Sequence, residues 1–129
     1  APEAAPAFDH GRRSRWNARF FERVDAYANR VARDHKAFAF RDLEISLPDH
    51  VVELGPGVGA NLGYLPAGTR LTAVEPNLAM HPALRARAEE RGVQLEVLAQ
   101  GAERLPFPDA SVDVVIATLV LCTVGDPDA

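Results

Sequence analysis

One stretch, residues 51–61 with the sequence VVELGPGVGAN, constrains the fold of this chain more than any other. It begins as an apolar run that predicts a buried strand, and it continues into a loop that contains Gly55, Gly57 and Gly59. Because glycine has no Cβ, such a loop can turn tightly and let a ligand lie against its backbone. A second apolar run ends at Glu75, whose carboxylate could accept hydrogen bonds from both hydroxyls of a ribose. The pattern therefore predicts a site for a nucleoside-containing cofactor.

The glycine pattern leaves two classes of cofactor open, because Gly55-x-Gly57-x-x-Ala60 also satisfies the dinucleotide fingerprint. Glu53 lies at the end of the predicted strand, where its charge would repel a pyrophosphate but attract a cationic amino-acid group. Residues 66–68 (Pro-Ala-Gly) leave room for only a short helix after the loop, a poor platform for an anion. A cationic, ribose-bearing ligand such as S-adenosylmethionine therefore fits better than NAD, and an NAD-dependent oxidoreductase is the alternative.

The remaining periodicity predicts an α/β fold, a Rossmann-like doubly wound and mainly parallel sheet. The expected strands are residues 51–54, 70–74, 93–98 and 112–117, and the expected helices are residues 61–65 and 82–91. Residues 101–110 are rich in proline and read as a loop. The last strand is nearly continuous Val and Ile, which predicts that both of its faces are buried.

The N-terminal part divides into a flexible leader, residues 1–13, and a helical segment, residues 14–47. Apolar residues recur through this segment at helical spacing, which predicts an amphipathic helix. They are Trp16, Phe20, Val24, Tyr27 and Val31. This stripe could pack on the sheet or on a missing part of the fold, or the helix could form a lid over the cofactor. Residues 48–129 form the cofactor-binding part.

Charge is distributed unevenly along the chain. Residues 1–41 hold nine Arg or Lys against five Asp or Glu, whereas residues 42–129 hold five against thirteen. The acidic main body argues against a nucleic-acid partner, since phosphate binding needs a positive surface. The basic helix could meet a membrane surface or an acidic substrate, or it could simply be solvated.

Cysteine and histidine usage sets further bounds. The single cysteine, Cys122, excludes an internal disulfide and is consistent with a reducing, cytoplasmic location. The four histidines show no metal-ligand spacing, so no metal site is indicated. Thirteen Arg to one Lys suggest a bacterial, GC-rich genome. Residues 126–129 (Asp-Pro-Asp-Ala) read as the start of a helix, so we expect that the C-terminal part of the fold is missing.

Three ordered motifs resemble those of class I S-adenosylmethionine-dependent methyltransferases of the methyltransferase type 11 kind. They are residues 51–59, residues 73–77 (AVEPN), and residues 103–107 (ERLPF) with residues 111–115 (SVDVV). Residues 59–61 (GAN) and 118–124 (TLVLCTV) look most like the methyltransferase-like 7 group, which includes thiol S-methyltransferases. The resemblance covers the chain from about Phe20 to its end.

The resemblance implies a set of cofactor-binding residues. Glu53 would hold the ammonium of the methionine part and Glu75 the ribose, while Ala102 would present its amide to the adenine. Gly101 stands where many relatives carry an Asp, which puts side-chain recognition of the exocyclic amine in doubt. The full predicted set is Glu53, Gly55, Gly57, Gly59, Asn61, Glu75, Pro76, Asn77, Gly101, Ala102, Glu103, Thr118 and Leu119.

The implied reaction is transfer of the sulfonium methyl group to a small-molecule acceptor by a single in-line displacement. Such a step depends mainly on alignment of the acceptor with the methyl group, and no residue of the chain can be named as a catalytic base. The resemblance makes a thiol the first expected acceptor and a lipid amine or a quinone-type carbon the next. A non-catalytic cofactor-binding module is the alternative of another class. The oligomeric state is left open.

Overall fold

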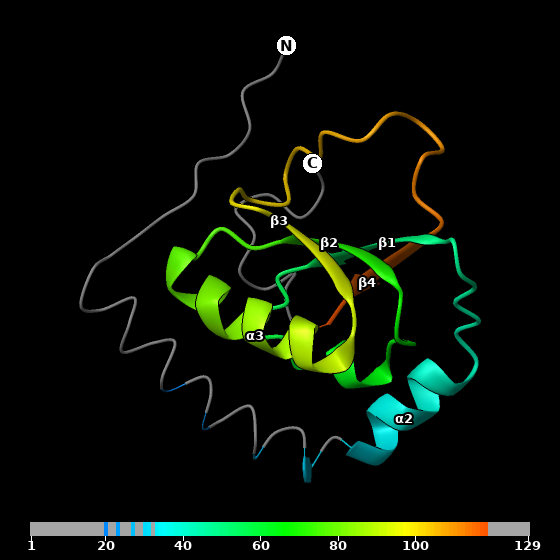
Figure 1. Ribbon diagram of the computed structural model, residues 1–129, viewed down its shortest axis with the longest axis vertical. Coiled ribbons are helices and arrows are strands. Elements are labelled where there is room, and N and C mark those ends of the chain that lie inside the picture. The colour runs from blue at the N-terminus through cyan, green and yellow to red at the C-terminus, as the bar shows by residue number, and fades with distance from the viewer. Residues whose placement is uncertain (1–19, 21–22, 24–26, 28–29, 32, 119–129) are drawn as a thin grey trace.

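The computed structural model describes residues 20, 23, 27, 30, 31 and 33–118, and it shows a four-stranded sheet with helix α3 across one face (Figure 1). The α-helices are α2 (Arg33–Arg41) and α3 (His81–Arg91), and the 3-10 helices are η1 (Leu62–Tyr64) and η2 (Leu78–Met80). The strands are β1 (His50–Leu54), β2 (Arg70–Val74), β3 (Gln94–Leu98) and β4 (Val114–Ala117). The predicted order of elements is confirmed, with ends that differ by one or two residues.

The sheet is parallel throughout and has the strand order β3-β2-β1-β4. In register, Val51 of the central strand β1 lies opposite Leu71 of β2 and Val114 of β4. After β3 the chain returns to the far side of β1, so the direction of winding reverses between β1 and β4. This reversal is the doubly wound arrangement that the sequence predicts, and it opens a crevice at the carboxyl ends of these two strands.

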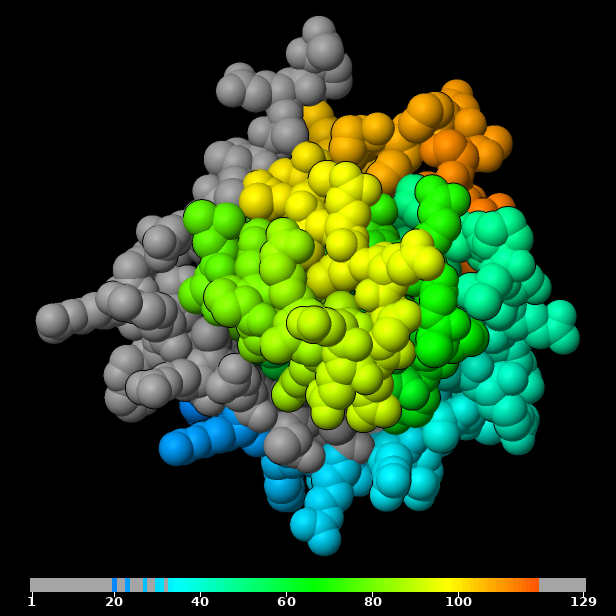
Figure 2. All heavy atoms as spheres, viewed as in Figure 1, coloured from blue at the N-terminus to red at the C-terminus, as the bar shows by residue number. Residues whose placement is uncertain are grey.

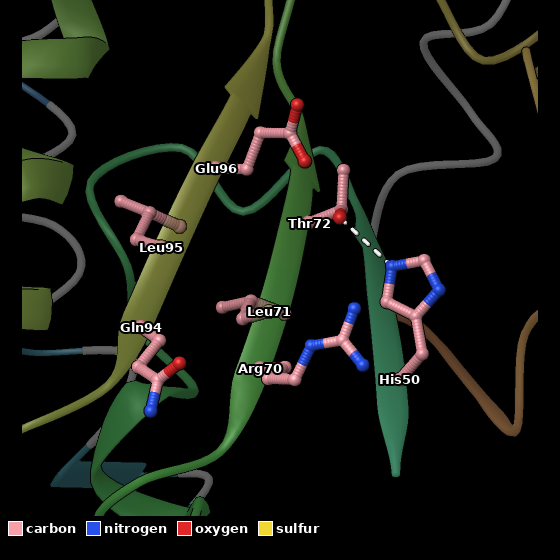
Figure 3. A pocket seen from close by; sticks show the side chains of 7 residues that line it. All are labelled: His50, Arg70, Leu71, Thr72, Gln94, Leu95 and Glu96. Atoms are coloured by element: carbon pink, nitrogen blue, oxygen red, sulfur yellow. Dashed lines mark hydrogen bonds between the residues drawn. The ribbon is translucent and has the colours of Figure 1, made fainter. Parts of the chain in front are cut away.

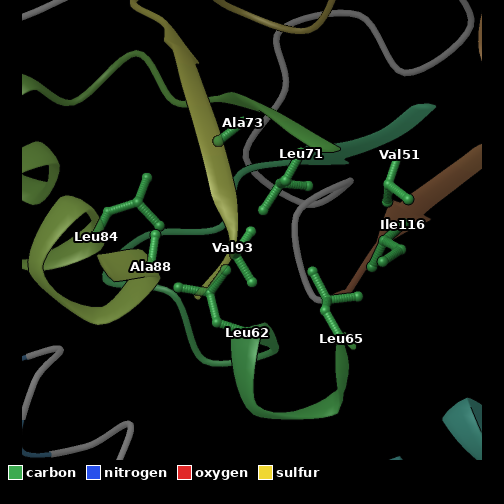
Figure 4. Packing of buried hydrophobic residues seen from close by; sticks show 9 residues of the cluster. All are labelled: Val51, Leu62, Leu65, Leu71, Ala73, Leu84, Ala88, Val93 and Ile116. Carbon is green, nitrogen blue, oxygen red and sulfur yellow. The ribbon is translucent and has the colours of Figure 1, made fainter. Parts of the chain in front are cut away.

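The core lies between the sheet and the helices α3 and η1 (Figure 4). Leu84 and Ala88 lie one turn apart on α3 and are fully buried against the strands. Pro82 occupies the first turn of α3, where its missing N–H costs nothing, and Gly92 ends the helix at φ 68°. The buried cluster is Val51, Leu62, Leu65, Leu71, Ala73, Leu84, Ala88, Val93 and Ile116.

The opposite face of the sheet is polar at its amino half. The imidazole Nε2 of His50 lies 2.9 Å from Thr72 Oγ1, and the ring meets Phe107 edge-on at 5.6 Å between centroids. Beside these residues a hollow of about 350 Å³ is lined mainly by polar side chains of β1, β2 and β3 (Figure 3). The hollow lies at the amino ends of the strands, away from the glycine loop.

The expectation that the last strand is buried on both faces is wrong. Ile116 is buried against the core, but Val115 is 58% exposed and Ala117 is also exposed. The cause is the position of β4 at an edge of the sheet, where no described element lies against its second face. An apolar run alone therefore predicted the strand but not its surroundings.

The helical segment before the sheet is attached through its C-terminal end. The ring of Phe40 in α2 stacks on Tyr64 in η1, with centroids 4.8 Å apart and an interplanar angle of 11°. The described members of the predicted apolar stripe do not pack on the sheet, since Phe20, Tyr27 and Val31 are 57%, 71% and 65% exposed. Of the three alternatives for this stripe, packing on the sheet therefore does not hold for these residues, and packing on a missing part of the fold and a role as a lid stay open. Residues 1–13 lie outside the described part.

Candidate functional site

The glycine loop follows β1 at the carboxyl edge of the sheet and has the backbone that the sequence predicted. Gly55, Gly57 and Gly59 have φ angles of 60°, 57° and 88°, in the left-handed region that glycine adopts at little cost. The amide of Gly55 donates to the carbonyl of Val74 at 2.9 Å, and that of Gly59 to the carbonyl of Pro56 at 2.9 Å. The loop is therefore joined to β2 and held in a tight turn.

Gly57 and Gly59 differ in what surrounds them, so alanine substitutions at the two positions should have different effects. A methyl group at Gly59 would meet Leu62 Cδ1 at 2.6 Å and Leu84 Cδ1 at 3.1 Å, whereas one at Gly57 would meet no described atom within 4 Å. We expect Gly59→Ala to lower the free energy of unfolding by about 2–4 kcal/mol through overpacking and backbone strain. Gly57→Ala should lower it by about 1–2 kcal/mol, from strain alone.

Urea unfolding of both variants measures these losses, and the Gly57→Ala variant serves as the control for backbone strain. The methyl group of Gly57→Ala would instead occupy open space in front of the loop, so its larger effect should be on ligand binding. Equal losses of stability in the two variants would contradict the packing argument.

Glu75 joins the glycine loop to the end of β2. One carboxylate oxygen accepts the amide of Gly57 at 2.9 Å, and the other accepts the amide of Asn77 at 2.8 Å. The side chain is buried, and burial raises the pKa of Glu75 above its ordinary value, while the two amide hydrogen bonds oppose that increase. Each carboxylate oxygen has a second lone pair, so the group can still accept hydrogen bonds from a ligand.

A second buried acid, Glu53, belongs to a polar cluster between β1 and β4. The Nδ2 group of Asn61 donates to Glu53 Oε1 at 2.8 Å and to Thr118 Oγ1 at 2.7 Å. Glu53 and Asn61 are each 1% exposed, yet Glu53 Oε2 and Asn61 Oδ1 have no hydrogen-bond partner among the described residues. Buried acceptors without a donor are costly, so this cluster could accept hydrogen bonds from the N–H groups of a ligand.

The charge state of Glu53 follows from this burial. Desolvation raises its pKa to about 7, although the hydrogen bond from Asn61 and the positive charge of Lys36 oppose the increase. Near neutral pH the carboxyl group therefore exchanges readily between its neutral and ionised forms. A cationic ligand would favour the ionised form.

The other predicted residues surround the same edge of the sheet. Asn77 accepts the amide of Ala79 at 3.1 Å and so caps η2, while Pro76 beside it is half-buried. Gly101, Ala102 and Glu103 form a half-buried bend after β3. Leu119 lies outside the described residues.

The structure adds two residues to this edge that sequence reasoning missed. Gln100 is buried, and its Nε2 group donates to the carbonyl of Arg104 at 2.7 Å, which holds the bend closed. His81 Nε2 lies 2.8 Å from the carbonyl oxygen of Glu75. Nothing in the sequence indicated either residue, because Gln100 lies two positions after β3 and His81 contacts the site through a backbone carbonyl.

No group of His, Cys, Asp or Glu side chains within the described ranges is arranged to hold a metal ion. Among the helices that the structure describes, none has the length and apolar character needed to cross a membrane.

A parallel, doubly wound sheet with a glycine loop and two buried acids at its carboxyl edge defines a Rossmann-like protein that binds a nucleoside-containing cofactor. Residues 52–129 match the family model described as a methyltransferase domain. The chain therefore belongs to this methyltransferase family, whose cofactor is S-adenosylmethionine.

Curated relatives bear out the resemblance to the thiol methyltransferase group. Thiol S-methyltransferase TMT1B from Homo sapiens is 42% identical over 80 residues, which cover 60% of this chain and 33% of the relative. Thiol S-methyltransferase TMT1A from Homo sapiens is 36% identical over 121 residues, which cover 88% of this chain and 50% of the relative. The chain thus spans a third to a half of the length of these relatives. Both are mammalian, so they do not support the predicted bacterial origin.

Solved structures support the fold. The YcgJ protein from Bacillus subtilis superposes with a TM-score of 0.55 at 23% identity, over 70% of this chain and 40% of that protein. A Thermotoga maritima protein, described as a SAM-dependent methyltransferase and possible histamine N-methyltransferase, superposes with a TM-score of 0.52 at 28% identity. This match covers 88% of this chain and 51% of that protein.

Proposed function

We propose that this chain forms the cofactor-binding part of an S-adenosylmethionine-dependent methyltransferase that acts on a small-molecule acceptor, first of all a thiol. The observation that carries the proposal is the pair of buried acceptors without a donor, Glu53 Oε2 and Asn61 Oδ1, beside the glycine loop. S-adenosylmethionine carries an ammonium group that can donate to both. It also carries a ribose, for which Glu75 provides acceptors at the end of the neighbouring strand.

The residues of the site fit this cofactor better than a dinucleotide. A pyrophosphate would bring negative charge toward Glu53, and η1 after the loop is only three residues long, so it offers little helix dipole to an anion. Gly57 leaves open space where a side chain would otherwise stand against the ligand. These features disfavour the NAD-dependent oxidoreductase alternative.

Each residue would have a distinct part in holding the cofactor. Asn61 orients Glu53 toward the ammonium through its hydrogen bond, and it keeps β1 and β4 together through its hydrogen bond to Thr118. Glu75 orients the ribose while it fixes the glycine loop through Gly57. We further propose that Pro76, Asn77 and residues 101–103 border the adenine, and that Gly55, Gly59 and Leu119 line the cofactor.

The bound cofactor would supply an electrophilic methyl group on a sulfonium. The protein then contributes mainly by holding acceptor and methyl group in line, because such a displacement needs no metal and little proton transfer. A thiol acceptor is already partly ionised near neutral pH. The names of the curated relatives favour a thiol over the lipid amine and quinone-type acceptors.

The test uses the full-length protein that contains this chain. It is incubated with S-adenosylmethionine and, in parallel, with a small alkyl thiol, a lipid amine and a quinol, and S-adenosylhomocysteine and methylated product are measured by mass spectrometry. We expect cofactor consumption with the thiol to exceed that with the other acceptors by about tenfold or more, a difference of over 1 kcal/mol in activation free energy.

Product from the amine or quinol alone would replace the thiol by that class. Saturable cofactor binding without turnover of any acceptor would favour the non-catalytic module, and reduction of NAD would restore the oxidoreductase alternative.

We also propose a location for the protein and a class of partner that it lacks. A cytoplasmic location rests on the single cysteine, Cys122, and the lack of a nucleic-acid partner rests on the acidic residues after position 41. That residues 14–47 act as a lid also stays a proposal. The stack of Phe40 in α2 on Tyr64 shows only that this segment contacts the short helix η1.

A further inference from the structure

Helix α2 turns two side chains toward the body of the protein. Lys36 and Phe40 are half-buried, whereas every other residue of α2 is exposed. Because the two lie four positions apart, they share one face of the helix. Figure 2 shows α2, in cyan, at the lower margin of the molecule. Lys36 therefore lies on the face by which α2 contacts the rest of the protein.

A short series of contacts connects this face of α2 to the cofactor site. The ring of Phe40 stacks on Tyr64, with centroids 4.8 Å apart. The amide of Tyr64 donates to the carbonyl of Asn61 at 2.9 Å, and the side chain of Asn61 donates to Glu53 Oε1 at 2.8 Å. Only Tyr64 and Asn61 thus stand between α2 and the buried carboxyl group of Glu53.

The charge of Lys36 acts on that carboxyl group. Lys36 is the only lysine among the fourteen basic residues of the chain. Its positive charge opposes the increase that burial causes in the pKa of Glu53, so its ammonium lies within electrostatic reach of the carboxyl group. Glu53 Oε2 nevertheless has no hydrogen-bond partner among the described residues. Lys36 therefore acts beside the acceptor that we propose for the cofactor's ammonium, and does not occupy it.

The amino-acid end of S-adenosylmethionine brings a negative charge to the same place. Its ammonium and its carboxylate are attached to one carbon atom, so a ligand with its ammonium on Glu53 also has its carboxylate nearby. Glu53 and Glu75 are both buried at this edge of the sheet. Two acids would repel a third carboxylate in such poorly solvated surroundings unless a cation lies beside it. Lys36 provides that cation.

We propose that Lys36 binds the carboxylate of the cofactor's methionine part, so that Glu53 and Lys36 hold the two opposite charges of the amino acid. This assignment rests on the proposed function, because it takes S-adenosylmethionine as the ligand and Glu53 as the partner of its ammonium. It makes Lys36 a residue that determines cofactor specificity. A ligand that keeps the ammonium but lacks the carboxylate would lose the contact with α2.

The experiment compares two ligands that differ only in this carboxylate. S-adenosylmethionine and decarboxylated S-adenosylmethionine are titrated calorimetrically into the full-length protein and into its Lys36→Met variant. We expect the unmodified protein to prefer the intact cofactor by roughly tenfold or more, as for a charge-assisted contact. Lys36→Met should remove most of this preference. Any loss of affinity that is the same for both ligands reflects the effect of Lys36 on Glu53, whereas the loss specific to the intact cofactor reflects the carboxylate contact.

Two further variants serve as controls, and circular dichroism checks the folding of each. Lys36→Arg keeps the positive charge and should keep the preference for the intact cofactor. Arg33→Met removes an exposed positive charge from the same helix and should bind both ligands like the unmodified protein. Equal affinity of the unmodified protein for the two ligands would overturn the assignment, as would equal losses for both in Lys36→Met. Binding of neither ligand by the folded protein would overturn the proposed function as well.

Discussion

Glu75→Ala is expected to abolish measurable S-adenosylmethionine binding, with a dissociation constant raised by roughly 100-fold or more. The change removes the proposed acceptors for the ribose hydroxyls. It also leaves the buried amides of Gly57 and Asn77 without the carboxylate that they now contact at 2.9 and 2.8 Å. Loss of a hydrogen bond to a charged group costs about 1.5–3 kcal/mol, so loss of both proposed hydrogen bonds to the ribose suffices for the predicted loss of affinity. Isothermal titration calorimetry of the full-length protein measures it.

Two further variants separate binding from folding. Glu75→Gln keeps the size of the side chain but only one acceptor oxygen, so it can keep one of the two backbone hydrogen bonds and should lose about tenfold in affinity. Glu96→Ala removes an exposed carboxylate from β3 and should bind like the unmodified protein. Unchanged affinity in a folded Glu75→Ala protein would remove Glu75 from the site.

Cofactor binding is expected to depend on pH through Glu53. Burial raises the pKa of Glu53 to about 7, and the proposed contact with the cofactor's ammonium requires the ionised carboxylate. Affinity should therefore fall by roughly tenfold for each pH unit below 7, because the neutral acid must first lose its proton. Titration in buffers of different ionisation enthalpy should show proton release on binding, and Glu53→Gln should abolish both the release and the pH dependence.

The same group affects stability without cofactor. The folded pKa lies above the unfolded value of 4.5, so the folded state holds its proton over the window from 4.5 to about 7. The stability gained below this window is lost as pH rises through it, on the order of 3 kcal/mol. Glu53→Gln should flatten this decline in urea unfolding, whereas Glu96→Gln should leave it in place. A decline that persists in Glu53→Gln would assign it to other groups.

The parts of the fold that depend on local patterns could be predicted from the sequence. The strand that ends at Leu54, the glycine loop and the strand that ends at Val74 follow from apolar runs, backbone freedom and spacing. The end of the helix at Arg91 was likewise predicted, and Gly92 ends α3 there with a left-handed φ of 68°.

Features that depend on distant contacts could not be predicted. The hydrogen bond from Asn61 to Thr118 joins residues 57 positions apart, and only the strand order brings them together. The exposure of Phe20, Tyr27 and Val31 was equally hidden, since helical periodicity identifies a face but not what covers it. The exposure of Val115 followed from the edge position of β4, which no local pattern reveals.

The reversal of winding between β1 and β4 also bears on how such a protein can diversify. The segments after β1, β2 and β3 lie on one side of the reversal and carry the residues proposed to hold the ammonium, the ribose and the adenine. Thr118, directly after β4, lies on the other side. At the carboxyl edge of the sheet, the side chain of Asn61 hydrogen-bonds to both sides, through Glu53 and Thr118. A sequence change on either side of the reversal therefore preserves the arrangement of this edge only if the amide bridge is kept.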